Sequence, residues 1–116
     1  MDREQLRRLR DAHRKSMHVE LERVRAELIA AGAELVILFG SAAEGELGLF
    51  SDIDLLVVIP SDLDFLPRIR DLYARICPRE MDIFPYTPVE FERLKDTNSF
   101  VRSAFRKGKV IYEKAA

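Results

Sequence analysis

Two short apolar runs set the strongest limit on how this chain can fold. ELVILF at 34–39 and DIDLLVVI at 52–59 are rich in Val, Ile and Leu, and each is followed at once by glycine or proline. Runs of this length and composition are typical of buried β-strands. Both are far shorter than the roughly 20 apolar residues that a membrane-spanning helix needs. We therefore expect a domain built around a small buried sheet, with no membrane span.

The length of 116 residues is that of one domain, which we expect to cover 1–116. Within it we expect an N-terminal helical region at 1–31 and a core at 34–113. A lone cysteine, Cys77, excludes an internal disulfide and is typical of a reducing compartment. The first residues, MDREQLRRLRD, lack the apolar stretch of a secretory signal. Together these features predict a cytoplasmic protein.

Helices are expected on both sides of the two strands in the sequence. Apolar residues between Leu6 and Leu28 recur at steps of three and four, which predicts a long amphipathic helix ending at Gly32. Its apolar stripe is expected to be core, and a dimer or partner surface is the alternative. A break near Ser16 would bring this helix to an ordinary length. Further helices are predicted within 61–76, 88–96 and 98–107, and further strands at 80–84 and 109–113. This order indicates an α/β (α+β) fold, a small mixed β-sheet flanked by helices.

The middle of the chain has an unusual charge distribution. Residues 32–67 contain seven acidic side chains and no lysine or arginine, although the chain has 19 basic residues. A solvated acidic loop would account for such a segment. A site whose charge is neutralised by a divalent cation would also account for it. The positions of the individual carboxylates distinguish the two explanations.

The predicted topology brings several polar residues to one edge of the sheet. The first strand ends at Gly40 and the second begins at Asp52 after a short loop, so we expect an antiparallel pair. A helix joins the second strand to the third, which favours a parallel pair. The end of the first strand then meets the beginnings of the other two. Gly40, Ser41, Asp52, Asp54 and Asp82 are therefore expected to lie together.

The chemistry of these residues indicates a metal and phosphate site. Asp52 and Asp54 are two positions apart on a strand and face the same side, with Asp82 on the neighbouring strand. Such carboxylates repel one another unless cations neutralise them or one is protonated. Oxygen ligands favour Mg²⁺ or Mn²⁺, and Gly40-Ser41 offers a backbone and a hydroxyl to a phosphate. Two such ions support attack of a hydroxyl on the α-phosphate of a nucleotide.

Gly40-Ser41, ten intervening residues, Asp52-x-Asp54 and a later strand aspartate resemble the DNA polymerase β-like nucleotidyltransferase superfamily. The sequence is most similar to the minimal members that act as antitoxins of HEPN-type ribonuclease toxins, and the ending NSFVRSAFRKGKVIYE also resembles their tail. The resemblance implies that Gly40 and Ser41 hold the nucleotide phosphates. It implies that Asp52 and Asp54 ligate both metal ions. Asp82 would complete the catalytic metal site and help to deprotonate the acceptor hydroxyl.

The resemblance, which covers about 34 to 113, also implies an activity. Family members of this type use Mg²⁺ and transfer AMP from ATP to protein acceptors, notably a tyrosine of the partner toxin. One departure concerns nucleotide binding. These proteins usually read GSxARG, whereas this chain has Glu44 in place of the basic residue. A Glu44 that faces the triphosphate would weaken nucleotide binding, and one that faces solvent would not.

Several alternatives remain open at this point. Because nothing in the chain resembles an acceptor-binding domain, we expect another chain to supply the acceptor, either a small helical toxin or a second copy. A non-catalytic antitoxin that neutralises its partner by direct contact through a degenerate site is the main alternative. Transfer to a small molecule or to an RNA end is a third. The acidic middle and the lack of a strong basic patch argue against extensive nucleic-acid binding.

Individual candidate residues also have ordinary structural explanations. Asp82 could form a surface ion pair with its neighbour Arg79, and Gly40 could belong to a plain turn. Asp52 and Asp54 could pair with arginine, although their own segment offers none. A set of basic residues near the C-terminus could touch phosphates or a partner, but a solvated helix flank is the simpler expectation for them: Arg102, Arg106, Lys107 and Lys109.

Overall fold

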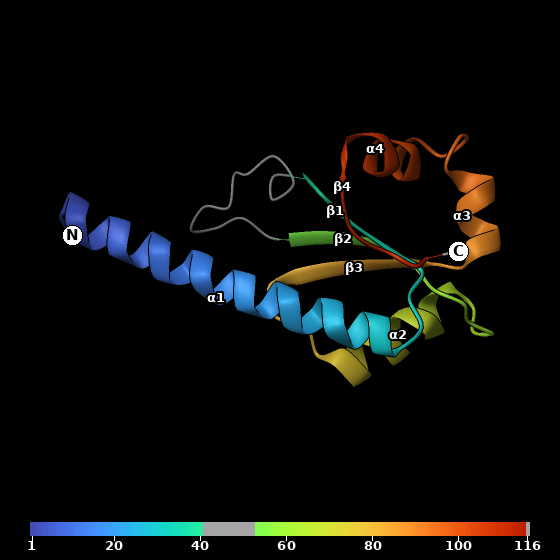
Figure 1. The fold of residues 1–116 in the computed structure, drawn as a ribbon, viewed down its shortest axis with the longest axis horizontal. Helices are drawn as coiled ribbons and strands as arrows, with labels where there is room; N and C mark the ends of the chain where they lie inside the picture. The colour runs from blue at the N-terminus through green and yellow to red at the C-terminus, as the bar shows by residue number, and fades with distance from the viewer. Residues whose placement is uncertain (41–52, 116) are drawn as a thin grey trace.

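The computed structural model describes residues 1–40 and 53–115 (Figure 1). Within these residues the elements follow in the order α1 (Arg3–Ala30), β1 (Leu35–Phe39), β2 (Ile53–Val58), α2 (Phe65–Ile76), β3 (Met81–Tyr86), α3 (Pro88–Leu94), α4 (Ser99–Lys107) and β4 (Lys109–Glu113). This is the order that the sequence predicts, and the fold is the expected mixture of a sheet and flanking helices. No helix of the described residues combines the length and the apolar content that a membrane span requires.

The strands form a mixed sheet in the order β3-β2-β1-β4. β1 is antiparallel to both β2 and β4, and β2 is parallel to β3, so both predicted strand pairings are confirmed. β3 continues to Tyr86, two residues beyond the predicted end, and includes Pro85. A proline is tolerated there because β3 is an edge strand, where a missing N–H costs no pairing on the outer side.

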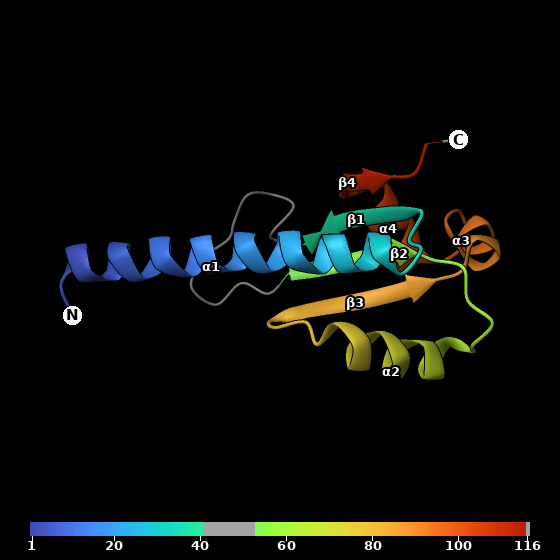
Figure 2. The ribbon, with the colours of Figure 1, turned by 60° about the horizontal axis from the view of Figure 1, so that its bottom comes forward.

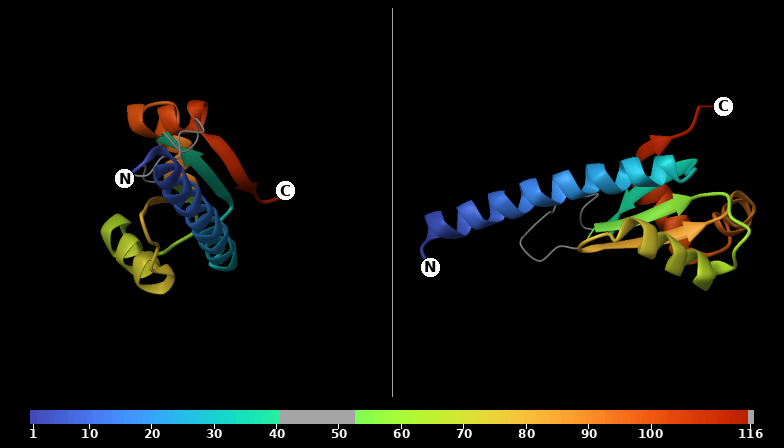
Figure 3. Two further views of the ribbon diagram at one scale, coloured as in Figure 1. Left: turned by 90° about the vertical axis from the view of Figure 1, so that its left-hand side faces the viewer. Right: turned by 90° about the horizontal axis from the view of Figure 1, so that it is seen from below.

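Helices cover both faces of the sheet. α1 and α2 lie on one face, and α3 and α4 lie on the other (Figures 2 and 3). Along β2, Leu55 and Val57 pack into the core beneath α1 and α2, whereas Leu56 and Val58 pack beneath α3 and α4. A strand that is buried on both faces needs apolar residues at consecutive positions, which accounts for the continuous run in its sequence.

α1 is one unbroken helix, so the expected break near Ser16 is wrong. Its N-terminus is closed by a capping box, in which Asp2 and Gln5 each accept a hydrogen bond from the other's backbone N–H. Its interior contains neither glycine nor proline. The chain leaves the helix at Gly32, whose φ of +104° is the left-handed conformation expected of a glycine at this position.

Only the C-terminal half of α1 packs on the sheet. Its buried residues begin at Met17, whereas Leu6 and Leu9 are 36% and 46% exposed. The expectation that the whole stripe from Leu6 to Leu28 is core is therefore wrong for its first half. A helix of 28 residues is roughly 42 Å long, about twice the span of strands of five or six residues. The N-terminal half therefore projects beyond one edge of the sheet (Figures 1 and 2).

α4 lies on the opposite face with only part of its apolar surface buried. Val101 and Ala104 are buried, whereas Phe100 and Phe105 are 40% and 44% exposed. Each of these two rings instead packs at the margin of the helix against other aromatic rings, as Phe105 does against Phe91 at 5.4 Å between ring centroids. Because α4 is short, it covers only the centre of the sheet. Its two phenylalanines lie at the border of the covered area.

A buried arginine joins α2 to the rest of the fold. The Arg68 residue is 3% exposed, and its guanidinium donates to both carboxylate oxygens of Glu90, at 2.7 and 3.2 Å. It also donates to the backbone carbonyl of Pro85 at 2.9 Å. These bonds connect α2, β3 and α3. Such pairing is what makes the burial of a charged side chain tolerable.

A buried glutamate anchors α1 in a similar way. Glu20 is 3% exposed and accepts from the side chain of Arg23 and from the backbone N–H of Arg79, each at 2.8 Å. The hydrogen bond from Arg23 outweighs burial and, with the Arg79 N–H, lowers the pKa of Glu20 to about 2. This contact ties α1 to the chain just before β3, near the edge of the sheet beyond which α1 projects.

Candidate active site

The predicted meeting point of three strands is present in the structure. Phe39, the last residue of β1, lies opposite Asp54 in the register of β1 and β2. Asp54 lies opposite Asp82 in the parallel register of β2 and β3. The prediction that Gly40, Asp54 and Asp82 share one edge of the sheet is thus confirmed. Ser41 and Asp52 lie outside the described residues, so their places in the site stay predictions.

Strand alternation directs the two aspartates to the same face. Ile53 and Leu55 flank Asp54 and are buried beneath α1 and α2, so Asp54 faces the side of α3 and α4. Met81 and Ile83 flank Asp82 in the same way. Neighbouring strands lie roughly 4.8 Å apart, which brings two paired carboxylates close together. Asp54 is half-buried, whereas Asp82 is exposed and open to a substrate.

Gly40 shapes the site through its backbone. Its φ of +78° is in the left-handed region, which side chains other than glycine rarely adopt. A Cβ at this position would lie only 2.8 Å from Oδ2 of Asp54. The carboxylate of Asp54 therefore lies directly against the backbone of Gly40. The left-handed conformation favours glycine here, and an added Cβ would also displace the carboxylate of Asp54.

The ordinary explanation of Asp82 as the ion-pair partner of Arg79 does not hold. Arg79 donates its backbone N–H to Glu20, and its guanidinium is 3.9 Å from the same carboxylate. Among the interactions of the described residues, Asp82 has neither a hydrogen bond nor an ion pair. An exposed carboxylate without a local partner, set beside a second carboxylate, is suited to binding a cation.

The oxygen donors fit a hard divalent cation. Asp54 and Asp82 offer only carboxylate oxygens, the ligands that Mg²⁺ and Mn²⁺ prefer. Over the described part of the chain, no three His, Cys, Asp or Glu side chains gather as ligands. The sequence places the third carboxylate, Asp52, immediately before β2 and outside that part. A pair of adjacent carboxylates with a third nearby in sequence is consistent with a metal site completed by substrate phosphates.

An aromatic cluster borders the carboxylates. The rings of Phe39, Phe84 and Phe100 lie with centroids 5.0 to 5.8 Å apart. Phe39 precedes Gly40, and Phe84 follows Asp82 by two positions on the same face of β3. The cluster thus forms an apolar wall beside the polar edge. The sequence analysis did not predict this cluster. The signal that could have indicated it is the spacing of Asp82 and Phe84, which are two positions apart on one strand and therefore share a face.

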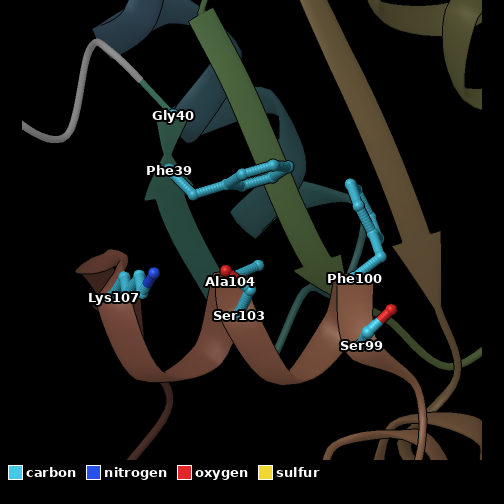
Figure 4. A pocket seen from close by; sticks show the side chains of 7 residues that line it. All are labelled: Phe39, Gly40, Ser99, Phe100, Ser103, Ala104 and Lys107. Carbon is cyan, nitrogen blue, oxygen red and sulfur yellow. The ribbon is translucent and has the colours of Figure 1, made fainter.

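A cavity of about 480 Å³ adjoins this wall, between the end of β1 and α4 (Figure 4). Phe39 and Gly40 line it from the sheet. The remaining lining residues come from one side of α4, namely Ser99, Phe100, Ser103, Ala104 and Lys107. The polar residues of α4 in this set were not predicted to belong to the site, apart from Lys107, for which a phosphate contact was one of the open alternatives.

Comparison with known proteins identifies the family. The family model described as polymerase beta, nucleotidyltransferase matches residues 28–116, which include the strands of the described residues and all of the candidate site residues. Neither the curated proteins nor the solved structures include a significant match to the chain. The matched residues include the sheet edge at which Asp54 and Asp82 are paired. The family is also the one that the motif spacing resembles. The chain belongs to the polymerase beta nucleotidyltransferase family.

Proposed function

We propose that the protein is a metal-dependent nucleotidyltransferase that moves AMP from ATP to a hydroxyl group of a partner protein, as the antitoxin of a HEPN-type ribonuclease toxin. The observation that carries the proposal is the pairing of Asp54 with Asp82 at the sheet edge, with Gly40 against the first carboxylate. Membership of the nucleotidyltransferase family supports the class of reaction. The choice of ATP and of a protein acceptor follows the resemblance to minimal family members.

Each residue of the site has a role in this reaction. Asp52, Asp54 and Asp82 would hold two Mg²⁺ ions, or Mn²⁺, which when bound supply charge neutralisation and orient the phosphates. Gly40 allows a phosphate to approach the backbone closely, and Ser41 provides a hydroxyl donor. As the acceptor oxygen bonds to the α-phosphorus, the bond to the bridging oxygen breaks and pyrophosphate leaves. The exposed carboxylate of Asp82 accepts the proton of the acceptor hydroxyl.

The shape of the molecule supports a protein as the acceptor. The N-terminal half of α1 projects beyond the same edge of the sheet at which β2 and β3 begin (Figure 1). Nε2 of His13 on this helix lies 3.8 Å from Oε2 of Glu80, the residue just before β3. Toward the N-terminus from His13, the same helix exposes the apolar side chains of Leu9 and Leu6. A partner helix packed along this surface would be brought next to the site.

The experiment uses ATP labelled at the α-phosphate, together with Mg²⁺ and a HEPN-type toxin as the candidate partner. We expect label on the partner with wild-type protein, and none with Asp54→Asn or Asp82→Asn at unchanged melting temperature. ATP labelled at the γ-phosphate is the matched control and should leave the partner unlabelled, because that phosphate departs in pyrophosphate. Label from the γ-phosphate would contradict nucleotidyl transfer.

One feature of the sequence favours a second candidate function. Glu44 stands where the minimal family members that the sequence resembles usually carry a basic residue, which is the change expected if nucleotide binding has been lost. The protein would then neutralise its partner by covering it. Cells that express the toxin with the Asp52→Asn, Asp54→Asn double variant distinguish the two functions. Growth equal to that with wild-type protein would support direct neutralisation, whereas loss of protection would support catalysis.

A further inference from the structure

The cavity beside the site has one polar wall. Ser99, Ser103 and Lys107 follow one another at four-residue intervals on α4, so they form a single row along the helix. Figure 4 shows this row along α4, with Lys107 at the helix end near Phe39 and Gly40 and Ser99 at the far end; Phe39 and Gly40 complete the lining. Since Gly40 is also in contact with the carboxylate of Asp54, the cavity opens beside the candidate metal site.

Close packing fixes the end of the row next to Gly40. Gly108, which follows Lys107, lies so tightly against β1 that an added Cβ would be 3.0 Å from the carbonyl oxygen of Leu38 and would overlap Cγ2 of Ile37. β4 then pairs with β1, with Lys109 opposite Leu38. These contacts hold the C-terminal end of α4 beside the last residues of β1. The placement of Lys107 near the site is therefore determined by backbone contacts rather than by a flexible loop.

Lysine and arginine side chains bind phosphate groups through strong charge-assisted hydrogen bonds. The segment from 32 to 67, which contains the Gly40-Ser41 motif and two of the aspartates, has no lysine or arginine. Among the described residues that line the cavity, Lys107 is the one cation. Within the described residues its ammonium group has no ion pair or hydrogen bond, so it is available to an anion.

We propose that Lys107 binds the terminal phosphates of the nucleotide, with the hydroxyl of Ser103 as a neighbouring donor. Lys107 thereby supplies from α4 the positive charge that the Gly40 segment lacks. The proposal rests on the proposed function and extends it by naming the residue that recognises the triphosphate. It also gives a reason why Glu44 is compatible with nucleotide binding, because the charge is provided by another element.

The test compares the dissociation constants of ATP and AMP in the presence of Mg²⁺, measured by titration calorimetry at fixed ionic strength. Lys107→Met keeps the length of the side chain and removes its charge. We expect it to weaken ATP binding about tenfold or more and to change AMP binding less than about twofold, because a charge-assisted hydrogen bond to the terminal phosphates is lost. Lys107→Arg should restore most of the affinity.

Arg106→Met is the matched control, since Arg106 is the neighbouring exposed cation and does not line the cavity. It should bind ATP as the wild type does. Two results would overturn the assignment of Lys107: equal losses of ATP affinity in the Arg106 and Lys107 variants, or unchanged ATP binding by Lys107→Met. In both cases, ATP binding by the wild-type protein would still uphold the proposed function. A wild-type protein that binds neither nucleotide would instead overturn the proposed function, and the assignment with it.

Discussion

Replacement of Gly40 by alanine separates the role of this glycine in the fold from its role in the site. The chain offers a matched control in Gly32, because both glycines have a positive φ, +78° at Gly40 and +104° at Gly32. Their surroundings differ. An added Cβ at Gly32 would meet nothing within 4 Å, whereas at Gly40 it would lie 2.8 Å from Oδ2 of Asp54.

The expected loss of stability is similar for the two variants. A left-handed backbone costs a residue with a Cβ about 1–2 kcal/mol. For a domain of this size that corresponds to a fall in melting temperature of about 4–8 °C. The additional contact at Gly40 involves the end of a side chain, so Asp54 can rotate away at little further cost in folding. Its carboxylate is then displaced from the position opposite Asp82.

The expected loss of function is therefore confined to Gly40→Ala. A displacement of about 1 Å in a catalytic group can lower the rate by roughly 10²-fold. Circular dichroism gives the melting temperatures, and the stabilisation of each variant by Mn²⁺ reports metal binding. Gly32→Ala should keep wild-type stabilisation by Mn²⁺ and wild-type label transfer. Equal effects of both substitutions on Mn²⁺ binding, or normal binding by Gly40→Ala, would refute the reasoning.

Three further predictions concern stability and partner binding. The pKa of Glu20, lowered to about 2 by Arg23, implies stability that is fully present above pH 4.5 and lost as the pH falls toward 2. Glu20→Gln should therefore lower the free energy of unfolding by about 2 kcal/mol at pH 7 and reduce the fall in melting temperature between pH 5 and 3. A melting temperature that falls with pH as steeply as in the wild type would contradict this role of Glu20. Arg68→Met should lower the free energy of unfolding, measured in urea, by about 3–5 kcal/mol, because the carboxylate of Glu90 stays half-buried without its partner. A loss below about 1 kcal/mol would contradict this. Deletion of residues 1–15 should lower the melting temperature by only a few degrees but abolish co-elution with the proposed toxin partner, and retained co-elution would place the binding surface for that partner elsewhere.

Several parts of this structure could be read from the sequence because local signals determine them. The capping box of Thr87 and Glu90, with Pro88 at the first helical position, is a local signal that starts α3 within the predicted helical range. The consecutive apolar residues of β2 gave a strand buried on both faces. Chain direction and the crossover through α2 then required Asp54 and Asp82 to meet. The sequence alone therefore determined the sheet and the described carboxylates of the site.

The tertiary structure decided which amphipathic surfaces find a partner. The apolar stripe of α1 has the same period on both sides of Met17, yet only the second half packs, because the strands are too short to reach the first. Likewise α4 carries basic residues on more than one side, and only its docking on β1 through Gly108 makes Lys107 the one that lines the cavity. Periodicity fixes the direction in which a side chain leaves its helix. What that side chain meets depends on the length and position of elements distant in sequence.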